Sequence, residues 1–174
     1  IVDFNKNYFE IFDLPVDYAV DLKLLDDRFL DLQKQVHPDR FAAGTDHEKR
    51  LAMQWATLVN TANETLRASL PRAIYLLGLR GVELETNPTL PPGFLMEQID
   101  LREQLESIEE GDGNLEELGS FRRKMQQEIN EVQAEFKEAL DEDIDKAERL
   151  VYQLQFLSKL MTSANRLEEK LLDY

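Results

Sequence analysis

The tripeptide His37-Pro38-Asp39 constrains the fold of this chain more than any other feature. The segment before it, residues 22–36, places apolar side chains at the spacing of one helix face. Proline lacks an N–H group and disfavours helical dihedral angles at the preceding residue, so this helix has to end at His37. The sequence therefore predicts a polar, proline-stiffened loop that displays His37, Asp39 and Arg40 and touches another protein. The apolar positions of the helix are Leu22, Leu25, Phe29, Leu32 and Val36.

Capping residues and hydrophobic periodicity predict four helices in residues 1–80. A short helix is expected near residues 7–12, and the second begins after Asp21, a good N-cap, and runs to the tripeptide. The third is expected to follow Thr45, since residues 45–48 fit a capping box. A brief fourth helix is expected with Pro71 at its first position. The second and third helices should pair as an antiparallel hairpin with the His37 loop at its tip.

Glycine and proline cluster in residues 81–93, which predicts a linker between two helical units. Three longer helices are expected after it: one over residues 94–109, one that begins after Asn114, and one over residues 142–172. Short connections favour an antiparallel three-helix bundle. The predicted fold class is all-α, with a helical hairpin and its accessory helices in residues 1–80 and the bundle in residues 94–174.

Composition excludes several classes of function. The formal net charge is −15, and residues 86–174 carry 21 acidic against 10 basic side chains, which argues against nucleic-acid binding and favours a basic partner for the second unit. Cysteine is absent, so disulfides and thiolate metal sites are excluded. No apolar run approaches the roughly 20 residues that span a bilayer, and no signal peptide is seen. We therefore expect no membrane partner and a cytoplasmic setting.

Several apolar side chains of the second unit fall on the outer side of their helices. If Leu101 and Leu105 face the core, Leu95, Met96 and Ile99 lie about 120° to 160° away at 100° per residue. The same reasoning places Phe156 about 140° from the inward stripe of the last helix. An apolar group with a carboxylate rim is typical of a docking surface. The alternative is ordinary packing, because each helix of a three-helix bundle has two neighbours.

A catalytic site is not indicated. His37 and Asp39 could act as a general acid/base pair or as two metal ligands, but the chain has only one other histidine, His47. Nothing in the sequence supplies a third ligand, a nucleophile with its base, or a glycine loop that cradles phosphate. We therefore expect a protein that is not an enzyme and needs no cofactor or metal.

The first unit resembles the J-domain family. The resemblance rests on Phe29 and Leu32 followed by the tripeptide and Arg40 between antiparallel helices, with Tyr8-Phe9 in the opening helix. It implies recruitment of a DnaK-class chaperone and stimulation of its ATP hydrolysis. The implied chaperone-binding residues are His37, Pro38, Asp39 and Arg40, with Arg28 and Lys34 adding positive charge. Asp27 and Asp31 dilute that positive charge.

The whole chain resembles the HscB family of co-chaperones in iron–sulfur cluster assembly. The resemblance rests on residues 66–81, 94–105, 156–160 and 167–172. It implies that the bundle binds the cluster scaffold IscU and that the J-domain presents this scaffold to the chaperone HscA. The implied scaffold-binding residues are Leu95, Met96, Ile99, Asp100, Glu103 and Phe156; a further acidic position of the family falls on Ser107.

No cysteine-rich zinc module precedes the J-domain, so we expect a bacterial, cytoplasmic member of this family that acts as a monomer. Two alternatives remain open. A J-domain adaptor for another client would stimulate the ATPase without binding the scaffold. A non-catalytic structural helical protein would do neither.

Overall fold

The computed structural model describes residues 3–111 and 114–173. Over these residues all regular secondary structure is helical, which confirms the predicted fold class. The chain forms two compact units, Ile1–Leu79 and Arg80–Tyr174. The predicted stop at Gly111-Asp112-Gly113 lies partly outside the described residues, because 112 and 113 are not among them.

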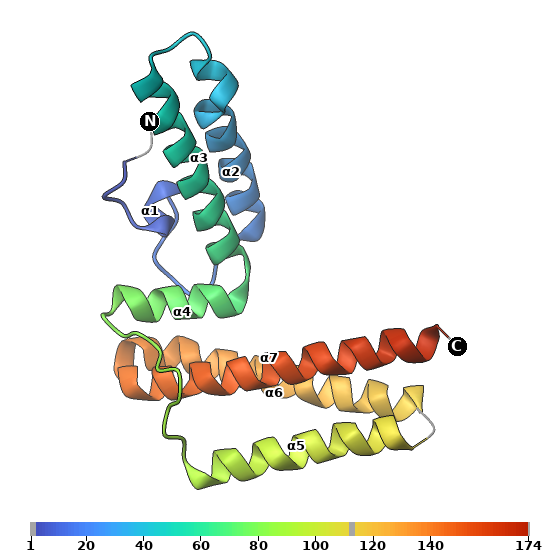
Figure 1. Cartoon of the computed structure of the whole chain (residues 1–174). Coiled ribbons are helices and arrows are strands. Elements are labelled where there is room, and N and C mark those ends of the chain that lie inside the picture. Colours follow the sequence, from blue (N-terminus) through green and yellow to red (C-terminus); the bar gives the residue numbers. More distant parts are fainter. Residues whose placement is uncertain (1–2, 112–113, 174) are drawn as a thin grey trace. The chain divides into compact units, whose positions relative to one another are not determined.

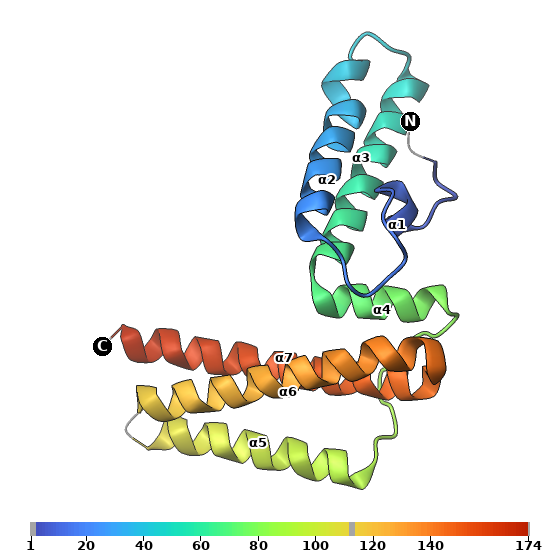
Figure 2. The same ribbon diagram turned by 180° about the vertical axis from the view of Figure 1, so that it is seen from behind.

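The first unit is a helical hairpin with accessory helices. Helix α2 (Leu22–Val36) and helix α3 (Asp46–Arg67) run antiparallel, and the 3₁₀ helix η1 (Pro38–Phe41) follows α2 directly. Helix α1 (Tyr8–Ile11) packs on α3, and α4 (Ser69–Leu79) lies across the base of the hairpin (Figures 1 and 2). The core of this unit contains Phe9, Phe12, Leu25, Val36, Trp55, Val59, Ala62, Leu66 and Leu77.

Local capping sets the ends of the hairpin helices, as the sequence predicts. The Asp21 carboxylate accepts a hydrogen bond from the Leu24 N–H at 3.1 Å, and the Thr45 hydroxyl accepts one from the Glu48 N–H at 3.1 Å. Each cap satisfies one of the backbone donors that the first turn of a helix leaves free. Helix α2 ends at Val36, immediately before His37 and Pro38, so the predicted stop is confirmed.

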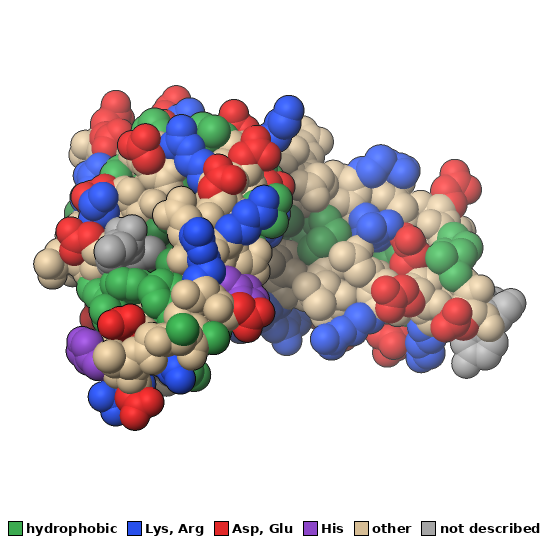
Figure 3. Space-filling model, turned by 90° about the horizontal axis from the view of Figure 1, so that it is seen from above, with side chains coloured by type: hydrophobic (Ala, Val, Ile, Leu, Met, Phe, Trp, Pro, Cys, Tyr) green, Lys and Arg blue, Asp and Glu red, His purple; other side chains and the backbone are tan. Residues whose placement is uncertain are grey.

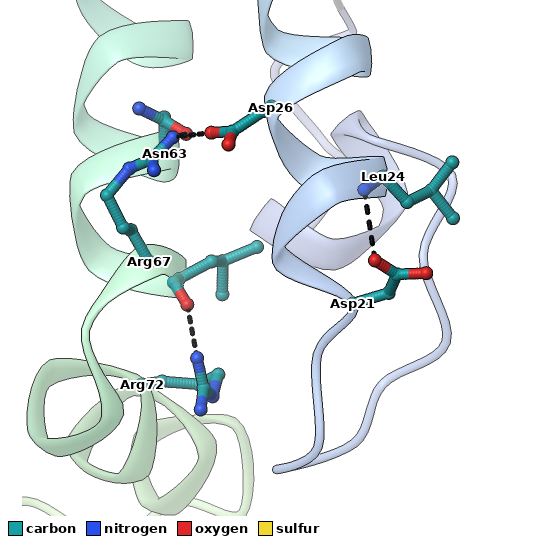
Figure 4. Close-up of polar contacts among 7 residues, drawn as sticks. Asp21, Leu24, Asp26, Asn63, Arg67 and Arg72 are labelled. Atoms are coloured by element: carbon teal, nitrogen blue, oxygen red, sulfur yellow. Dashed lines mark hydrogen bonds and ion pairs between the residues drawn. The ribbon is translucent and has the colours of Figure 1, made fainter.

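Polar contacts join the two helices of the hairpin. Arg67 of α3 donates to the carboxylate of Asp26 on α2 and, at 3.2 Å, to the amide oxygen of Asn63 (Figure 4). Arg72 of α4 is buried and donates to the Leu66 carbonyl at 2.6 Å. The α3–α4 corner is therefore held by a side-chain-to-backbone hydrogen bond, and the α2–α3 contact by an ion pair.

Helix α4 begins earlier than the sequence predicts. Its first residue is Ser69, so Pro71 stands at the third position instead of the first. Proline is tolerated there because the N–H groups of the first turn have no partner within the helix. The Arg72 N–H then bonds to the Ala68 carbonyl at 3.0 Å, which closes the first turn around Pro71.

The second unit is an antiparallel three-helix bundle. Helices α6 (Leu115–Glu142) and α7 (Ile144–Leu172) pack together along their length, and α5 (Pro92–Glu110) contacts both (Figures 1 and 2). Asn114 and Asp143 are the N-caps of α6 and α7. Helix α5 begins two residues before the expected Phe94, because the Phe94 N–H bonds to the Pro91 carbonyl at 3.0 Å and so includes Pro92 in the first turn.

The segment between α4 and α5 is bound to the bundle at two points. Arg80 donates to the Leu140 carbonyl at 3.1 Å and pairs with Asp141 at 2.7 Å. Further along, the Glu85 N–H donates to the Tyr152 hydroxyl at 2.8 Å. Residues 80–91 therefore follow the surface of the second unit.

Candidate functional site

The loop that follows α2 is a tight turn whose side chains point to solvent. Pro38 is the first residue of η1, and the Arg40 N–H bonds to the His37 carbonyl at 3.0 Å. The His37 side chain is 55% exposed and the Asp39 side chain 92%. All four predicted loop residues are exposed, so the structure presents them where a macromolecular partner can reach them.

Lys34 of α2 lies beside this loop. Together with Gln33, it borders a surface depression of about 490 Å³ that His37 and Arg40 complete. Figure 3, which views the protein from above, shows basic and acidic side chains intermixed on its surface. Lys34 and Arg40 supply local positive charge at the depression.

Arg28 has a structural role in the first unit. Its guanidinium donates to the carbonyl oxygens of Phe12 and Asp13 and lies 3.7 Å from the Asp13 carboxylate. Asp13 has a positive φ of 51°, in the left-handed region that a non-glycine residue rarely adopts. Arg28 thus holds the strained turn that follows α1, and its charge is partly neutralised there.

The outer face of α5 exposes three large apolar side chains. Leu95 is 45% exposed, Met96 67% and Ile99 57%, whereas Leu101, Leu105 and Ile108 are buried, which confirms the predicted orientation of the helix. Asp100 is the next residue after Ile99, and Glu103 lies one turn further; both are exposed. A face of this kind combines an apolar centre with a carboxylate edge.

The expectation that Phe156 lies on an outward-facing surface is wrong. Its side chain is only 9% exposed, because α5 covers that side of α7. The Phe94 ring meets it edge-on at 6.3 Å between ring centroids, and the Arg102 guanidinium lies over the ring, 5.9 Å from its centroid. Phe156 therefore forms part of a groove of about 260 Å³ between α5 and α7.

Two features near the α5 face are not evident in the sequence. One is Arg102, which covers the Phe156 ring. The other is a groove of about 880 Å³ between α5 and α6, whose lining includes Asp100, Glu103, Glu116 and Glu117 together with Lys124. The positions of Glu116 and Glu117 in the sequence, just after the N-cap Asn114, indicate solvated side chains at a helix end. Only the packing of α6 beside α5 brings them into the same acidic rim.

Within the described residues, no group of three or more His, Cys, Asp or Glu side chains has an arrangement that could hold a metal ion. The helices in the same part of the chain also lack the combination of length and hydropathy needed to cross a membrane.

Comparison with known proteins identifies the family. Residues 90–165 match the sequence family described as the HSCB C-terminal oligomerisation domain. The structure of the chaperone HscB from Vibrio cholerae is similar over 95% of this chain and 99% of that one, with a TM-score of 0.87 and 36% sequence identity. The chain belongs to the HscB family of co-chaperones. The resemblance inferred from the sequence is thereby confirmed.

Two further structures agree with this HscB assignment. The human co-chaperone protein HscB has a TM-score of 0.87 and 26% identity, over 95% of this chain and 84% of the human one. The Jac1 co-chaperone from Saccharomyces cerevisiae has a TM-score of 0.73 and 23% identity, over 94% and 95% of the two chains, and shows the common fold. In this HscB-family chain the exposed loop belongs to the first unit and the exposed α5 face to the second.

Proposed function

We propose that this co-chaperone is a two-ended adaptor in iron–sulfur cluster assembly. The loop of residues 37–40 contacts the ATPase domain of an HscA-type, DnaK-class chaperone and stimulates ATP hydrolysis. The outer face of α5 binds an IscU-type scaffold. The observation that carries the proposal is the exposure of Leu95, Met96 and Ile99 together on one helix face. Membership of the HscB family supports it.

The physical basis of scaffold binding is apolar burial at the centre and charge at the edge. Covering the three apolar side chains removes their surface from water, at roughly 25 cal/mol per Å². Asp100 and Glu103 sit at the margin, where they favour a partner with Lys or Arg at matching positions and speed its association. Because Phe156 is buried, it serves this surface by supporting α5 from below.

The adaptor needs no chemistry of its own. Since the scaffold-binding face and the chaperone-binding loop belong to one chain, a bound scaffold stays at a raised effective concentration near the chaperone. We propose that the protein works as a monomer without a cofactor in the bacterial cytoplasm, and that no catalysis occurs on it. Light scattering on the free protein tests whether it is a monomer. This test matters because the description of the matched family names an oligomerisation domain.

Calorimetric titration of purified IscU-type scaffold tests the α5 face. The triple variant L95A/M96A/I99A should weaken binding by about 100-fold, since central apolar residues of an interface commonly contribute 1 kcal/mol or more each. Leu115 of α6 is similarly exposed at 46%, so L115A is the matched control and should bind normally. Unchanged affinity in the triple variant, with helicity intact, would exclude this face.

Steady-state ATPase assays with the HscA-type chaperone test the loop. Asp39→Asn should remove most of the stimulation, because it deletes the exposed negative charge of the loop while keeping the size of the side chain. Glu64→Gln, at an exposed position near the end of α3 that is remote from the loop, is the control and should stimulate as the wild type does. Full stimulation by D39N would show that the loop is not the contact.

A further inference from the structure

We infer that His37 is a positioning residue, which caps the η1 turn through its Nδ1 atom and thereby sets how Asp39 is presented to the partner. The inference rests on the proposed chaperone contact of the loop. Its basis is one hydrogen bond: the Asp39 N–H donates to His37 Nδ1 at 3.2 Å. His37 occupies the N-cap position of η1, with extended backbone angles of φ −58° and ψ 132°.

Two backbone N–H groups of the turn donate to His37, one to its ring nitrogen and one to its carbonyl oxygen. Pro38 has no N–H group, so the Asp39 N–H is the first donor of the turn, and the ring nitrogen accepts it. The next donor, the Arg40 N–H, bonds to the His37 carbonyl at 3.0 Å. The Ala42 N–H then bonds to the Asp39 carbonyl at 3.4 Å. Removing the ring leaves the first of these donors without its protein acceptor.

The same hydrogen bond determines where the proton of the neutral ring lies. A nitrogen that accepts an N–H carries no proton, so in neutral His37 the proton is on Nε2. Nδ1 also lies 3.6 Å from the Asp39 carboxylate, but without a proton it cannot donate to it. The carboxylate is therefore left without a hydrogen bond from the neutral ring, and its side chain is 92% exposed. His37 therefore fixes the backbone of Asp39 and leaves its carboxylate free to contact the partner.

Side-chain length decides which residues can replace His37. Nδ1 is two bonds from Cβ, the same distance as the Oδ1 atom of asparagine, and asparagine is among the best N-cap residues. Glutamine carries its acceptor one bond further out, and alanine carries none. If positioning is the role of His37, H37N restores it, while H37Q and H37A do not.

The test measures ATPase stimulation of the HscA-type chaperone by full-length H37N, H37Q, H37A and D39N over a range of concentrations. H37N should require a concentration for half-maximal stimulation within about two-fold of the wild type. H37A and H37Q should require about five-fold more, the equivalent of one lost N-cap. At saturation H37A should approach the wild-type maximum, since Asp39 is still present.

The outcomes separate this inference from the proposed function. If H37N is as poor as H37A, the imidazole itself contacts the partner and the positioning role is wrong. Wild-type behaviour of H37A would overturn it as well. In both cases a defective D39N leaves the loop as the contact, whereas a fully active D39N overturns the proposed function itself.

Nitrogen-15 NMR of the free protein gives a readout that does not depend on the partner. The His37 Nδ1 resonance of the neutral ring should fall in the range of an unprotonated imidazole nitrogen and Nε2 in that of a protonated one. The Asp39 amide should exchange faster in H37A than in H37N. A proton on Nδ1, or equal Asp39 exchange in the two variants, would contradict the inference.

Discussion

Glu97 of α5 and Glu128 of α6 lie close enough in the bundle for the carboxyl group of Glu97 to raise the pKa of Glu128. Burial raises the pKa of Glu128 above its usual value of 4.5, and the nearby charge of Glu97 raises it further. The Oε2 atom of Glu128 is buried and finds no hydrogen-bond partner among the described residues. Two carboxylates in this position oppose the contact between α5 and α6 when both are ionised.

Glu128→Gln should stabilise the protein at neutral pH by about 0.5 kcal/mol, because it removes the repulsion and keeps a hydrogen-bonding group. The folded-state pKa of Glu128 is raised, so its favourable contribution is complete below pH 4.5 and is lost as pH rises through the raised value. The advantage of E128Q should therefore shrink as the pH falls toward 4.5. Urea unfolding at several pH values measures this.

Glu135→Gln, at an exposed position of α6, is the control for the carboxylate pair, and its effect on stability should be small at every pH. An E128Q variant whose stability follows the wild-type pH profile without divergence would show that the pair does not oppose folding.

Arg28→Lys should destabilise the protein by about 1 kcal/mol, although the charge is kept. Lysine cannot bond to the Phe12 and Asp13 carbonyls in the geometry of the guanidinium, so the turn after α1 loses its support. Lys34→Ala, in contrast, should leave the midpoint of urea unfolding unchanged and reduce ATPase stimulation. If R28K is as stable as the wild type and R28A loses stimulation, the charge of Arg28 acts on the chaperone.

Phe156→Ala should destabilise the second unit by about 3 kcal/mol, since it removes a buried ring and leaves a cavity under Phe94 and Arg102. Met96→Ala should change the free energy of unfolding by less than about 0.5 kcal/mol, because Met96 is 67% exposed. Both should weaken scaffold binding, M96A by losing contact area and F156A by loosening α5. Chemical denaturation followed by circular dichroism shows whether each variant loses folding stability. An F156A variant as stable as the wild type would refute the role of Phe156 as a buried packing residue.

Tyr152→Phe should loosen the segment around Glu85, while the Arg80 contacts still hold its start on the bundle. The Tyr152 hydroxyl accepts from the Glu85 N–H at 2.8 Å and donates to the Glu148 carboxylate at 3.0 Å, so phenylalanine removes both bonds at a cost of about 1–2 kcal/mol. Hydrogen exchange at the Glu85 amide should rise, while exchange at the Arg72 amide in α4 should not change. Unaltered exchange at Glu85 would mean that the segment is held elsewhere.

Helix positions in this chain are largely readable from local chemistry. Asp21, Thr45 and Asn114 each cap a helix at the expected residue, because an N-cap bond joins a side chain to a backbone N–H only two or three residues away. The stop at His37 is equally local, since Pro38 imposes it through its own ring. The starts of α4 and α5 differ by two residues from expectation, because proline fits several positions of a first helical turn.

The candidate functional surfaces also combine features that are predictable from one helix with features that depend on packing between helices. Exposure of Met96 and Ile99 follows from the angle between successive residues of one helix, so it could be predicted from local periodicity, as could the all-α class and the exposed loop at His37. Burial of Phe156 beneath Phe94 and Arg102 depends on which neighbour covers a given side of α7. That burial depends on the packing of the helices, as does the approach of Glu97 to Glu128. Periodicity defines the faces of a helix, but contacts between residues far apart in the chain exist only once the helices have packed.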